Sequence, residues 1–373
     1  MLYRRVPSSL LRSFSTAISL HVPSLRAQFR AMAVAEYTIS TAYFTPHTAL
    51  GEGPTFVPQT NELYYVDIHR CQICAVKLPE SAPSMTIACA SDASAPAITA
   101  YEPWSEGAAA IRKTTYSEPI GVLALLDSSP EKFLVGGKYG FAVAKPNESA
   151  KLEYLTKVYQ PEDKLYAIMR VNDGNVDPTG EHFFAGTMEQ DIPQERSALK
   201  IGTFYRYSAD GSCTALFDKC QIPNGLVWTS DNRTMFWNDS PSSTVWKFDY
   251  DVATGTPSNR QAFITIDAKG EVPDGMTISA QDDLFIAIWG GSRVEQRDST
   301  TGALKAVFKL PGKKITCPTF GGPGLEDLFV TSAAANEDID HVWTEADGLG
   351  GEIFRFKVPG HHGKVRGVFK GIA

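Results

Sequence analysis

Residues 246–255, Trp-Lys-Phe-Asp-Tyr-Asp-Val-Ala-Thr-Gly, combine a strand whose aromatic and charged residues alternate with a turn that ends in glycine. The turn recurs 47 residues later as Arg-Asp-Ser-Thr-Thr-Gly, residues 297–302. Alternation of this kind is typical of a strand with one buried face. A repeat of roughly 40 to 50 residues is typical of the blades of a β-propeller. The sequence therefore predicts an all-β fold built from repeated sheets.

A second kind of turn repeats inside the same units. Residues 177–180, 230–232 and 280–282 are turn sequences, and each is followed by an aromatic or aliphatic strand. Dividing residues 41–373 by the repeat length predicts a six-bladed β-propeller, inside the usual range of about four to eight blades. We expect the ring to close by pairing a strand near Tyr43 with the last blade.

Two segments, 91–117 and 333–349, are too polar and irregular for blade strands. We predict that both are long loops, which either cover the central mouth or lie elsewhere on the surface.

The first 31 residues differ in composition from the rest of the chain. They contain five arginines and several serines, and no acidic residue precedes Glu36. This composition predicts a transit peptide for mitochondrial import. The alternative is a disordered leader, with a second start at Met32 giving a cytoplasmic form. Residues 32–40 are expected to be a linker.

Composition also limits the partners. The formal net charge is −7 and the body has no basic run, which argues against nucleic acid as a partner. No apolar stretch approaches the roughly 20 residues that a membrane-spanning helix needs, so we expect a soluble protein with no membrane partner. No obligatory protein partner is evident.

The six cysteines do not form a dense disulfide framework. Cys71 and Cys74 form a CxxC pair, but no second pair supplies the remaining ligands of a structural zinc site. We expect reduced, mostly buried thiols rather than a zinc site.

Four oxygen-bearing side chains occupy matching positions before the inner turns. Asn172, Asn224 and Asp274 each lie eight residues before the turn landmarks Gly180, Asn232 and Asp282, and Glu52 lies nine residues before Asn61. A glycine follows each of them within two residues, which lets the backbone approach a shared ligand closely. In a closed ring, equivalent positions converge on the axis, so we expect these four groups to meet. The alternative is that Asn-Gly and Asp-Gly are ordinary turn dipeptides.

Two carboxylates and two carboxamides form a hard oxygen cage. Such a cage suits one divalent cation: calcium, magnesium or manganese, or zinc if waters complete the shell. A cation with open positions activates water and polarises a carbonyl, as hydrolysis of esters and lactones requires. Asp274 would be both ligand and general base, and Glu52 a ligand only. Arg170, two residues before Asn172, would face the same side and donate to substrate hydroxyls or to an oxyanion, although a structural salt bridge is its alternative role.

Several motifs in one order resemble the senescence-marker-protein-30 (regucalcin) and gluconolactonase family. The matching segments are Leu50–Pro54, Arg170–Pro178, Phe184–Met188, Pro223–Trp228, Asp249–Asp251, Val272–Met276, Gly290–Val294 and Phe320–Pro323. The resemblance implies a six-bladed propeller with one catalytic divalent metal.

The resemblance also implies roles for individual residues. Glu52, Asn224 and Asp274 match the metal ligands of the family, and Asp274 matches its proton acceptor. Arg170 and Asn172 match residues that hold the sugar lactone. A further acidic substrate contact falls near Glu189–Asp191, and we assign it to Asp191.

The first functional hypothesis is therefore hydrolysis of sugar (aldono) lactones to aldonic acids. The alternatives are a calcium-binding regulatory protein of the regucalcin type without significant turnover, and a related propeller esterase. Retention of Arg170 and Asn172 beside the cage favours the enzyme, because an ion buffer has no need of substrate contacts. A propeller that only binds proteins would need no converging acidic residues.

Overall fold

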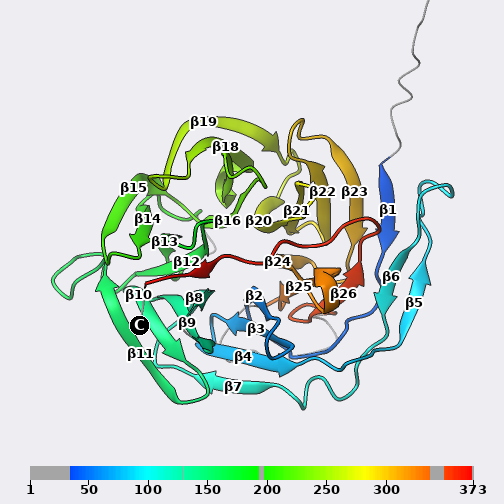
Figure 1. Cartoon of the computed structure of the whole chain (residues 1–373), viewed down its shortest axis with the longest axis horizontal. Coiled ribbons are helices and arrows are strands. Elements are labelled where there is room, and N and C mark those ends of the chain that lie inside the picture. Colours follow the sequence, from blue (N-terminus) through cyan, green and yellow to red (C-terminus); the bar gives the residue numbers. More distant parts are fainter. Residues whose placement is uncertain (1–33, 128, 193–196, 337–347, 372–373) are drawn as a thin grey trace, which may run out of the picture. The chain divides into compact units, whose positions relative to one another are not determined.

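The chain folds into a propeller-like ring of antiparallel sheets (Figure 1). This computed structural model describes residues 34–127, 129–192, 197–336 and 348–371. In these ranges the only helical elements are two single turns of 3-10 helix, Ser240–Ser242 and Pro323–Leu325. The all-β, propeller-like prediction is confirmed.

Three sheets contain four strands each, in the order of the chain. The first holds β2 (Gly51–Val57), β3 (Glu62–Asp67), β4 (Gln72–Lys77) and β7 (Arg112–Thr115). The others hold β12 (Met169–Val176), β13 (His182–Glu189), β14 (Gly202–Ser208) and β15 (Cys213–Cys220), and then β16 (Pro223–Trp228), β17 (Thr234–Asp239), β18 (Thr244–Asp251) and β19 (Thr256–Thr265).

A fourth sheet has five strands and the last has ten. The five are β8 (Ile120–Leu126), β9 (Ser129–Gly137), β10 (Gly140–Lys145), β11 (Ser149–Lys157) and β27 (Val368–Phe369). The ten are β20 (Val272–Ile278), β21 (Asp283–Trp289), β22 (Arg293–Asp298), β23 (Leu304–Lys309), β1 (Ala35–Thr38), β24 (Lys314–Gly321), β25 (Asp327–Ala333), β26 (Phe354–Lys357), β6 (Ile98–Tyr101) and β5 (Ser84–Ile87). Within it, a single residue pair, Trp289 with Lys314, joins β21 to β24.

Burial explains why the inner and outer strands differ in sequence. All seven residues of β2 and of β8 are buried, because each of these strands is covered on both faces. The outer strand β11 has only one buried residue, Leu152, in a run of exposed and half-buried positions. The inner strands are therefore buried along their length, including the polar residues that face the channel, whereas the outer strands have one buried side.

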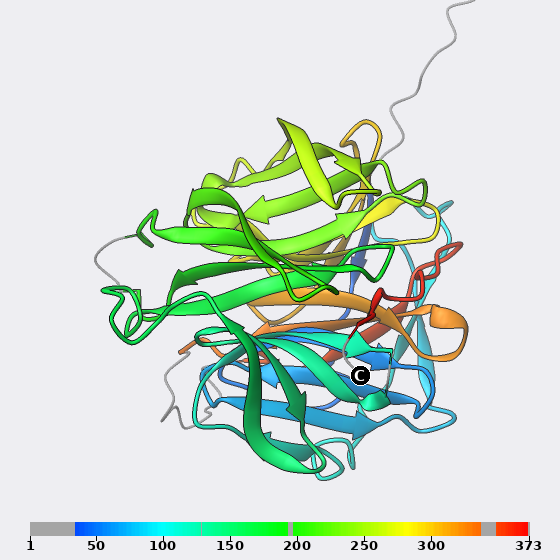
Figure 2. The same ribbon diagram turned by 60° about the vertical axis from the view of Figure 1, so that its left-hand side comes forward.

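Apolar side chains fill the spaces between neighbouring sheets. One cluster joins Tyr64 and Val66 of β3 to Phe133 and Val135 of β9. Another joins Phe204 of β14 to Trp237 of β17 and Phe248 of β18. Figure 2 shows the sheets following one another around the ring.

The ring closes through a segment that we expected to be a loop. Within residues 91–117, β6 pairs with β26 and β7 pairs with β4, so the loop prediction for this segment was wrong. Most of the segment is polar because only β6 has a buried side, formed by Ile98 and Ala100, whereas β7 is an edge strand that is mostly exposed. Near Tyr43 there is no extended pairing, only the isolated bridge of Phe44 with Ile353, so the expected closing strand is supplied mainly by β5 and β6.

A buried ion pair holds this closure together. The Arg355 guanidinium donates to Asp327 Oδ2 from Nε at 3.1 Å and from Nη2 at 2.5 Å. The Tyr101 hydroxyl donates to Asp327 Oδ1 at 2.7 Å, and Arg355 Nη1 donates to the Tyr43 hydroxyl at 2.8 Å. Asp327 is 0% exposed and Arg355 is 5% exposed. Tyr43 and Tyr101, from the first third of the chain, therefore meet the Asp327–Arg355 ion pair from its last part.

Both ends of the described chain add parallel edge strands. Residues 35–38, inside the expected linker 32–40, form β1 and pair with β23. The C-terminal segment 358–371 crosses the middle of the ring and ends with β27 beside β8 (Figure 1). The predicted leader, residues 1–31, and most of the predicted loop 333–349 lie outside the described residues.

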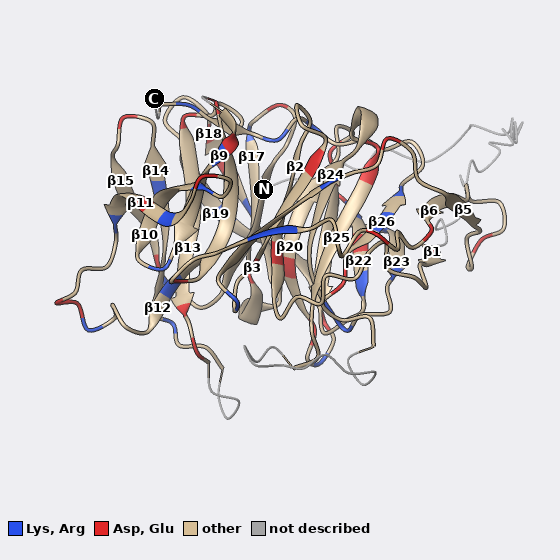
Figure 3. Ribbon diagram, turned by 90° about the horizontal axis from the view of Figure 1, so that it is seen from below, with Lys and Arg blue, Asp and Glu red and all other residues tan. Residues whose placement is uncertain are grey.

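The remaining features concern charge and cysteine. Figure 3 shows acidic and basic residues interspersed along the described strands and loops. None of the described helices is long and apolar enough to cross a membrane. The six cysteines are free thiols, and four of them are buried: Cys74, Cys89, Cys220 and Cys317.

Candidate metal and substrate site

The predicted site residues lie at a bulge that is repeated on the innermost strands. Pairing of each inner strand with its neighbour shifts register at nearly the same place: between Glu52 and Thr55, Ile120 and Val122, Val171 and Gly174, Pro223 and Leu226, Pro273 and Met276, and Ile315 and Pro318. A bulge inserts unpaired residues and re-aims their side chains. Asn172, Asn224 and Asp274 lie inside these shifts and Glu52, paired with Val66, borders one, which is how the strands can direct these side chains toward the axis.

The turn landmarks and the glycines behave as the sequence predicted. Asn61, Gly180, Asn232 and Asp282 all have positive φ, between 53° and 76°, a conformation that Asn, Asp and Gly tolerate best. A Cβ on Gly225 would lie 2.5 Å from the backbone nitrogen of Met276. The glycine after Asn224 therefore lets β16 and β20 approach each other.

The four converging groups line one pocket with a volume of about 770 Å³. Glu52, Asn172, Asn224 and Asp274 are all buried, with between 4% and 7% of each residue exposed. Arg170 and Asp191 line the same pocket. The structure thus brings together every residue that the sequence assigned to the site.

Hydrogen bonds fix the amides of the site. Arg170 Nη1 donates to Asn172 Oδ1 at 2.6 Å, and Asn172 Nδ2 donates to the Pro223 carbonyl at 2.8 Å. Asn224 Nδ2 donates to Ser240 Oγ at 2.8 Å, and Ser240 Oγ donates to the Pro273 carbonyl at 2.7 Å. Asn224 Oδ1 is 3.3 Å from Asn172 Nδ2. Because its NH₂ group is held by Ser240, Asn224 presents its oxygen to the pocket.

The electrostatics of the site show an excess of buried negative charge. Burial and, to a smaller extent, the nearby Asp173 raise the pKa of Glu52 to about 8, although the Gly53 N–H and Arg170 act in the opposite direction. Burial likewise raises the pKa of Asp173 to about 6. The cationic side chains present do not fully compensate these carboxylates, so the site favours a proton or another cation.

Oxygen donors dominate the candidate ligand set. In the described residues no group of three or more His, Cys, Asp and Glu side chains is placed to hold a metal ion. Glu52 and Asp274 supply two carboxylates, and Asn224 adds an amide oxygen. This donor chemistry fits a hard divalent cation better than a transition metal that prefers nitrogen or sulfur.

The acidic residue beyond β13 lies at the mouth of the pocket. Asp191 is exposed and lines the pocket, with its Oδ2 3.5 Å from Gln190 Nε2. Glu189 is buried and accepts a hydrogen bond from the Leu199 N–H. Position therefore favours Asp191 over Glu189 as the residue that can meet a ligand.

Sequence reasoning missed several residues around the site. Ser240 holds Asn224, and Gln190 lines the pocket with a buried Oε1 that has no hydrogen-bond partner among the described residues. Cys317 lies at the bulge of β24, where burial raises the pKa of its thiol far above the usual value. Counting eight residues back from Gly324, which has a positive φ, gives Thr316, so the register count could have located this bulge but not Cys317 itself.

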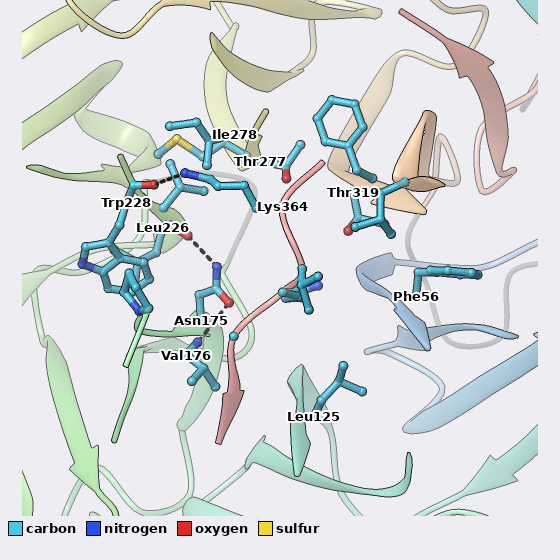
Figure 4. A pocket seen from close by; sticks show the side chains of 18 of the residues that line it. Phe56, Leu125, Asn175, Val176, Leu226, Trp228, Thr277, Ile278, Thr319 and Lys364 are labelled. Carbon is cyan, nitrogen blue, oxygen red and sulfur yellow. Dashed lines mark hydrogen bonds between the residues drawn. The ribbon is translucent and has the colours of Figure 1, made fainter. Parts of the chain in front are cut away.

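The opposite end of the channel is a separate pocket crossed by the C-terminal segment. This pocket, of about 290 Å³, is lined by Phe56, Leu125, Trp228 and Ile278 among others, and Lys364 reaches the Trp228 carbonyl (Figure 4). Arg366 on the same segment donates to the Pro54 carbonyl at 2.6 Å and to Thr55 Oγ1 at 2.9 Å. The C-terminal segment thus closes the channel beneath the candidate metal site.

A ring of antiparallel sheets with polar side chains gathered in one pocket at the inner strands defines a propeller-like protein with one candidate polar site. Comparison with known proteins agrees. Residues 50–334 match the model of the SMP-30/Gluconolactonase/LRE-like region. Chicken (Gallus gallus) regucalcin is 30% identical over 306 residues, which cover 82% of this chain and 90% of the relative, and human regucalcin is 29% identical over 288 residues, covering 77% and 84%.

Solved structures give the same answer. A luciferin-regenerating enzyme superposes with a TM-score of 0.71 at 25% identity, covering 87% of this chain and 96% of that one. Regucalcin from Agrobacterium tumefaciens, described as a calcium-binding protein, superposes with a TM-score of 0.69 at 23% identity, covering 89% and 98%, which supports the fold. The chain belongs to the SMP-30/gluconolactonase family.

Proposed function

We propose that this protein is a divalent-metal-dependent lactonase that opens sugar lactones to their aldonic acids. The observation that carries the proposal is the convergence of Glu52, Asn224 and Asp274 on the floor of one large pocket, with Arg170 and Asn172 beside them. Membership of a family that includes gluconolactonases supports the same reaction.

Glu52, Asn224 and Asp274 would hold the cation. The raised pKa of Glu52 supports this assignment, because a carboxylate that lacks compensation in a buried site gains most from a divalent ion. When bound, the cation supplies Lewis acidity that polarises the lactone carbonyl and makes water more acidic. The oxygen donors fit calcium, magnesium or manganese, and zinc with added waters.

The side chains have separate roles in the proposal. Asp274 accepts the proton of the attacking water, which requires a carboxylate within hydrogen-bond reach of that water. Asn172 and Asp191 bind hydroxyl groups of the lactone. Arg170 fixes Asn172 through its 2.6 Å hydrogen bond and adds positive charge beside the position where the carbonyl oxygen becomes an anion.

A calcium-binding role without significant turnover is the second candidate, because the most similar relatives include proteins named regucalcin. Both candidates use the same ligands. A third candidate is a related propeller esterase. The pocket has room for other esters, but no specific feature of it favours them.

Proton release distinguishes these candidates. Chelator-treated protein is given glucono-, galactono- or arabinono-lactone, and calcium, magnesium, manganese or zinc is restored singly. Metal-dependent acid production supports the lactonase. If calorimetry shows metal binding in the same preparation and no lactone is opened with any metal, the lactonase proposal is wrong and the calcium-binding role is favoured.

We also infer that the ring has six blades. The ten-stranded sheet is joined at one residue pair only, so it divides into β20–β23 with β1 and β24–β26 with β6 and β5. Six apolar clusters in the described residues, each between neighbouring strand groups, support this count.

Residues 1–31 are proposed to direct import into mitochondria, with a start at Met32 giving a cytoplasmic form. The arginine-rich, acid-free composition supports this proposal. Residues 1–31 fused to a fluorescent protein should accumulate in mitochondria, and a diffuse signal would contradict the proposal.

A further inference from the structure

The pocket has a second layer of side chains above its polar floor. Side chains alternate along a strand, so residues two positions apart face the same side. Two positions before the floor residues and their equivalents on the innermost strands lie Leu50, Pro119, Arg170, Ile222, Val272 and Lys314. All six line the pocket. The second layer therefore lines the site, although Leu50 also packs in the core between two sheets.

Most of this second layer is apolar. Four of its six members carry no polar side-chain group, and Trp289, the cross-strand partner of Val272, stands beside them. Ile68, after β3, completes what we call the apolar collar, which consists of Leu50, Ile68, Pro119, Ile222, Val272 and Trp289. Pro119, Ile222, Val272 and Trp289 are partly exposed, unlike the fully buried residues of the inter-sheet cores.

The two cations of the layer already have protein partners. Arg170 Nη1 donates to Asn172 and to the Val171 carbonyl. Lys314 Nζ donates to the Ala335 carbonyl at 2.8 Å and lies 5.3 Å from the centre of the Trp289 ring. These six positions of the wall therefore offer mainly carbon surface, whereas Gln190 and Asp191 supply hydrogen-bonding groups elsewhere in the pocket.

A ligand made only of a polyhydroxylated ring matches this wall poorly. Hydroxyl groups placed against carbon surface lose water without gaining partners, which costs free energy. The pocket volume of about 770 Å³ is in the range of roughly 300 to 1,000 Å³ that is typical of pockets for drug-sized ligands. The pocket therefore has room for a lactone ring and a substituent on it.

We propose that the preferred substrate is a lactone that carries an apolar substituent, with the ester on the polar floor and the substituent against the apolar collar. This inference rests on the proposed lactonase function and specifies its substrate class. Sugar lactones without a substituent are then poorer substrates of the same site.

The first test is an alkyl series. Proton release is measured for δ-valerolactone and for δ-lactones with propyl and pentyl tails, beside glucono-δ-lactone, with the cation that supports activity. Burial of each methylene is expected to raise kcat/KM about two- to fourfold, mainly through KM. Calorimetry with δ-lactams that carry the same tails measures binding in the absence of turnover.

Variants locate the effect. Ile222→Thr keeps the branch at Cβ but replaces the ethyl arm by a hydroxyl, and it should lower kcat/KM for the pentyl lactone about tenfold, and less for δ-valerolactone. Leu155→Thr is the matched control, because Leu155 is 39% exposed on the outer strand β11 and does not line the pocket. The control substitution should change kcat/KM for neither the pentyl lactone nor δ-valerolactone.

The outcomes separate this inference from the proposed function. If lactones are opened but kcat/KM does not rise with tail length, or glucono-δ-lactone is preferred, the substituent proposal is overturned and the lactonase stands. If no lactone is opened while lactam affinity rises with tail length, the collar binds apolar groups as inferred and the lactonase proposal fails. If no lactone is opened and lactam affinity does not rise with tail length, both the lactonase proposal and the substituent proposal are overturned.

Discussion

Replacing Asp327 by Asn should destabilise the ring at its closure. The substitution keeps the size of the side chain but removes the charge that faces Arg355, whose Nε and Nη2 both donate to Asp327 Oδ2. With 5% exposure, the guanidinium cannot turn to water. Breaking a buried ion pair by removing one partner costs about 3 to 5 kcal/mol. For a unit of this size, that corresponds to a fall in Tm of about 6 °C.

The assay is equilibrium unfolding in urea, followed by tryptophan fluorescence, together with a thermal scan. Glu36→Gln is the control, because it breaks an ion pair with Lys309 in which both side chains are substantially exposed, 40% and 51%. Exposed pairs contribute little, so the control should leave the urea midpoint unchanged.

The reasoning is refuted if Asp327→Asn and Glu36→Gln have the same midpoint as the parent protein. Such a result would mean that Arg355 finds other compensation, for instance from the faces of Tyr101 and Tyr43, which lie 3.9 and 5.0 Å from its guanidinium carbon. A large loss in Asp327→Asn that Arg355→Met largely restores as a second change would confirm that the uncompensated charge is the cause.

Four further predictions concern the site, pH and the ends of the chain. Asp274→Ala should abolish lactone turnover and weaken metal binding, and proton release above background would contradict its role as base. Burial raises the pKa of Glu352 to about 8, so the folded state holds a proton that the unfolded chain releases near pH 4 to 5. Its contribution to stability is therefore complete below about pH 4 and lost as pH rises to 8, at up to about 1.4 kcal/mol per pH unit, a slope that Glu352→Gln should remove from urea titrations. Arg366→Ala deletes the hydrogen bonds to Pro54 and Thr55 and should lower the free energy of unfolding by about 1 to 3 kcal/mol in the same assay, whereas an unchanged midpoint would show that the C-terminal segment is held by other contacts. Deletion of residues 1–31 should leave folding and activity intact, and loss of soluble protein would show that the domain boundary is misplaced.

The inner half of the ring could be predicted from the sequence because its residues obey local rules. Asn61, Gly180, Asn232 and Asp282 are residue types that tolerate positive φ, and counting back from them gives the register of the strands. Since equivalent strand positions converge on the axis, that count was enough to bring Glu52, Asn172, Asn224 and Asp274 into one pocket.

The outer parts could not be predicted because their structure depends on distant partners. β6 and β7 are four-residue strands, too short to be recognised alone, and β7 is also mostly exposed, so its sequence lacks the alternation that indicates a strand. The role of Arg366 depends on where the C-terminal segment crosses the channel, and nothing near residue 366 indicates this path. The apolar collar was missed because Ile222 and Val272 look like ordinary strand residues until the pocket is seen.

The pairing of β6 with β26 also sets the order in which the protein can fold. Residues 98–101 can pair with β5 as soon as both strands have been made, but they meet β26 only after residues 354–357 have followed. Contacts of such long sequence separation form slowly. Until the ring closes, the edges of β6 and β26 that pair with each other stay open, and open strand edges promote aggregation. Newly made chains should therefore depend on chaperones most strongly until residues 354–357 have been made and paired.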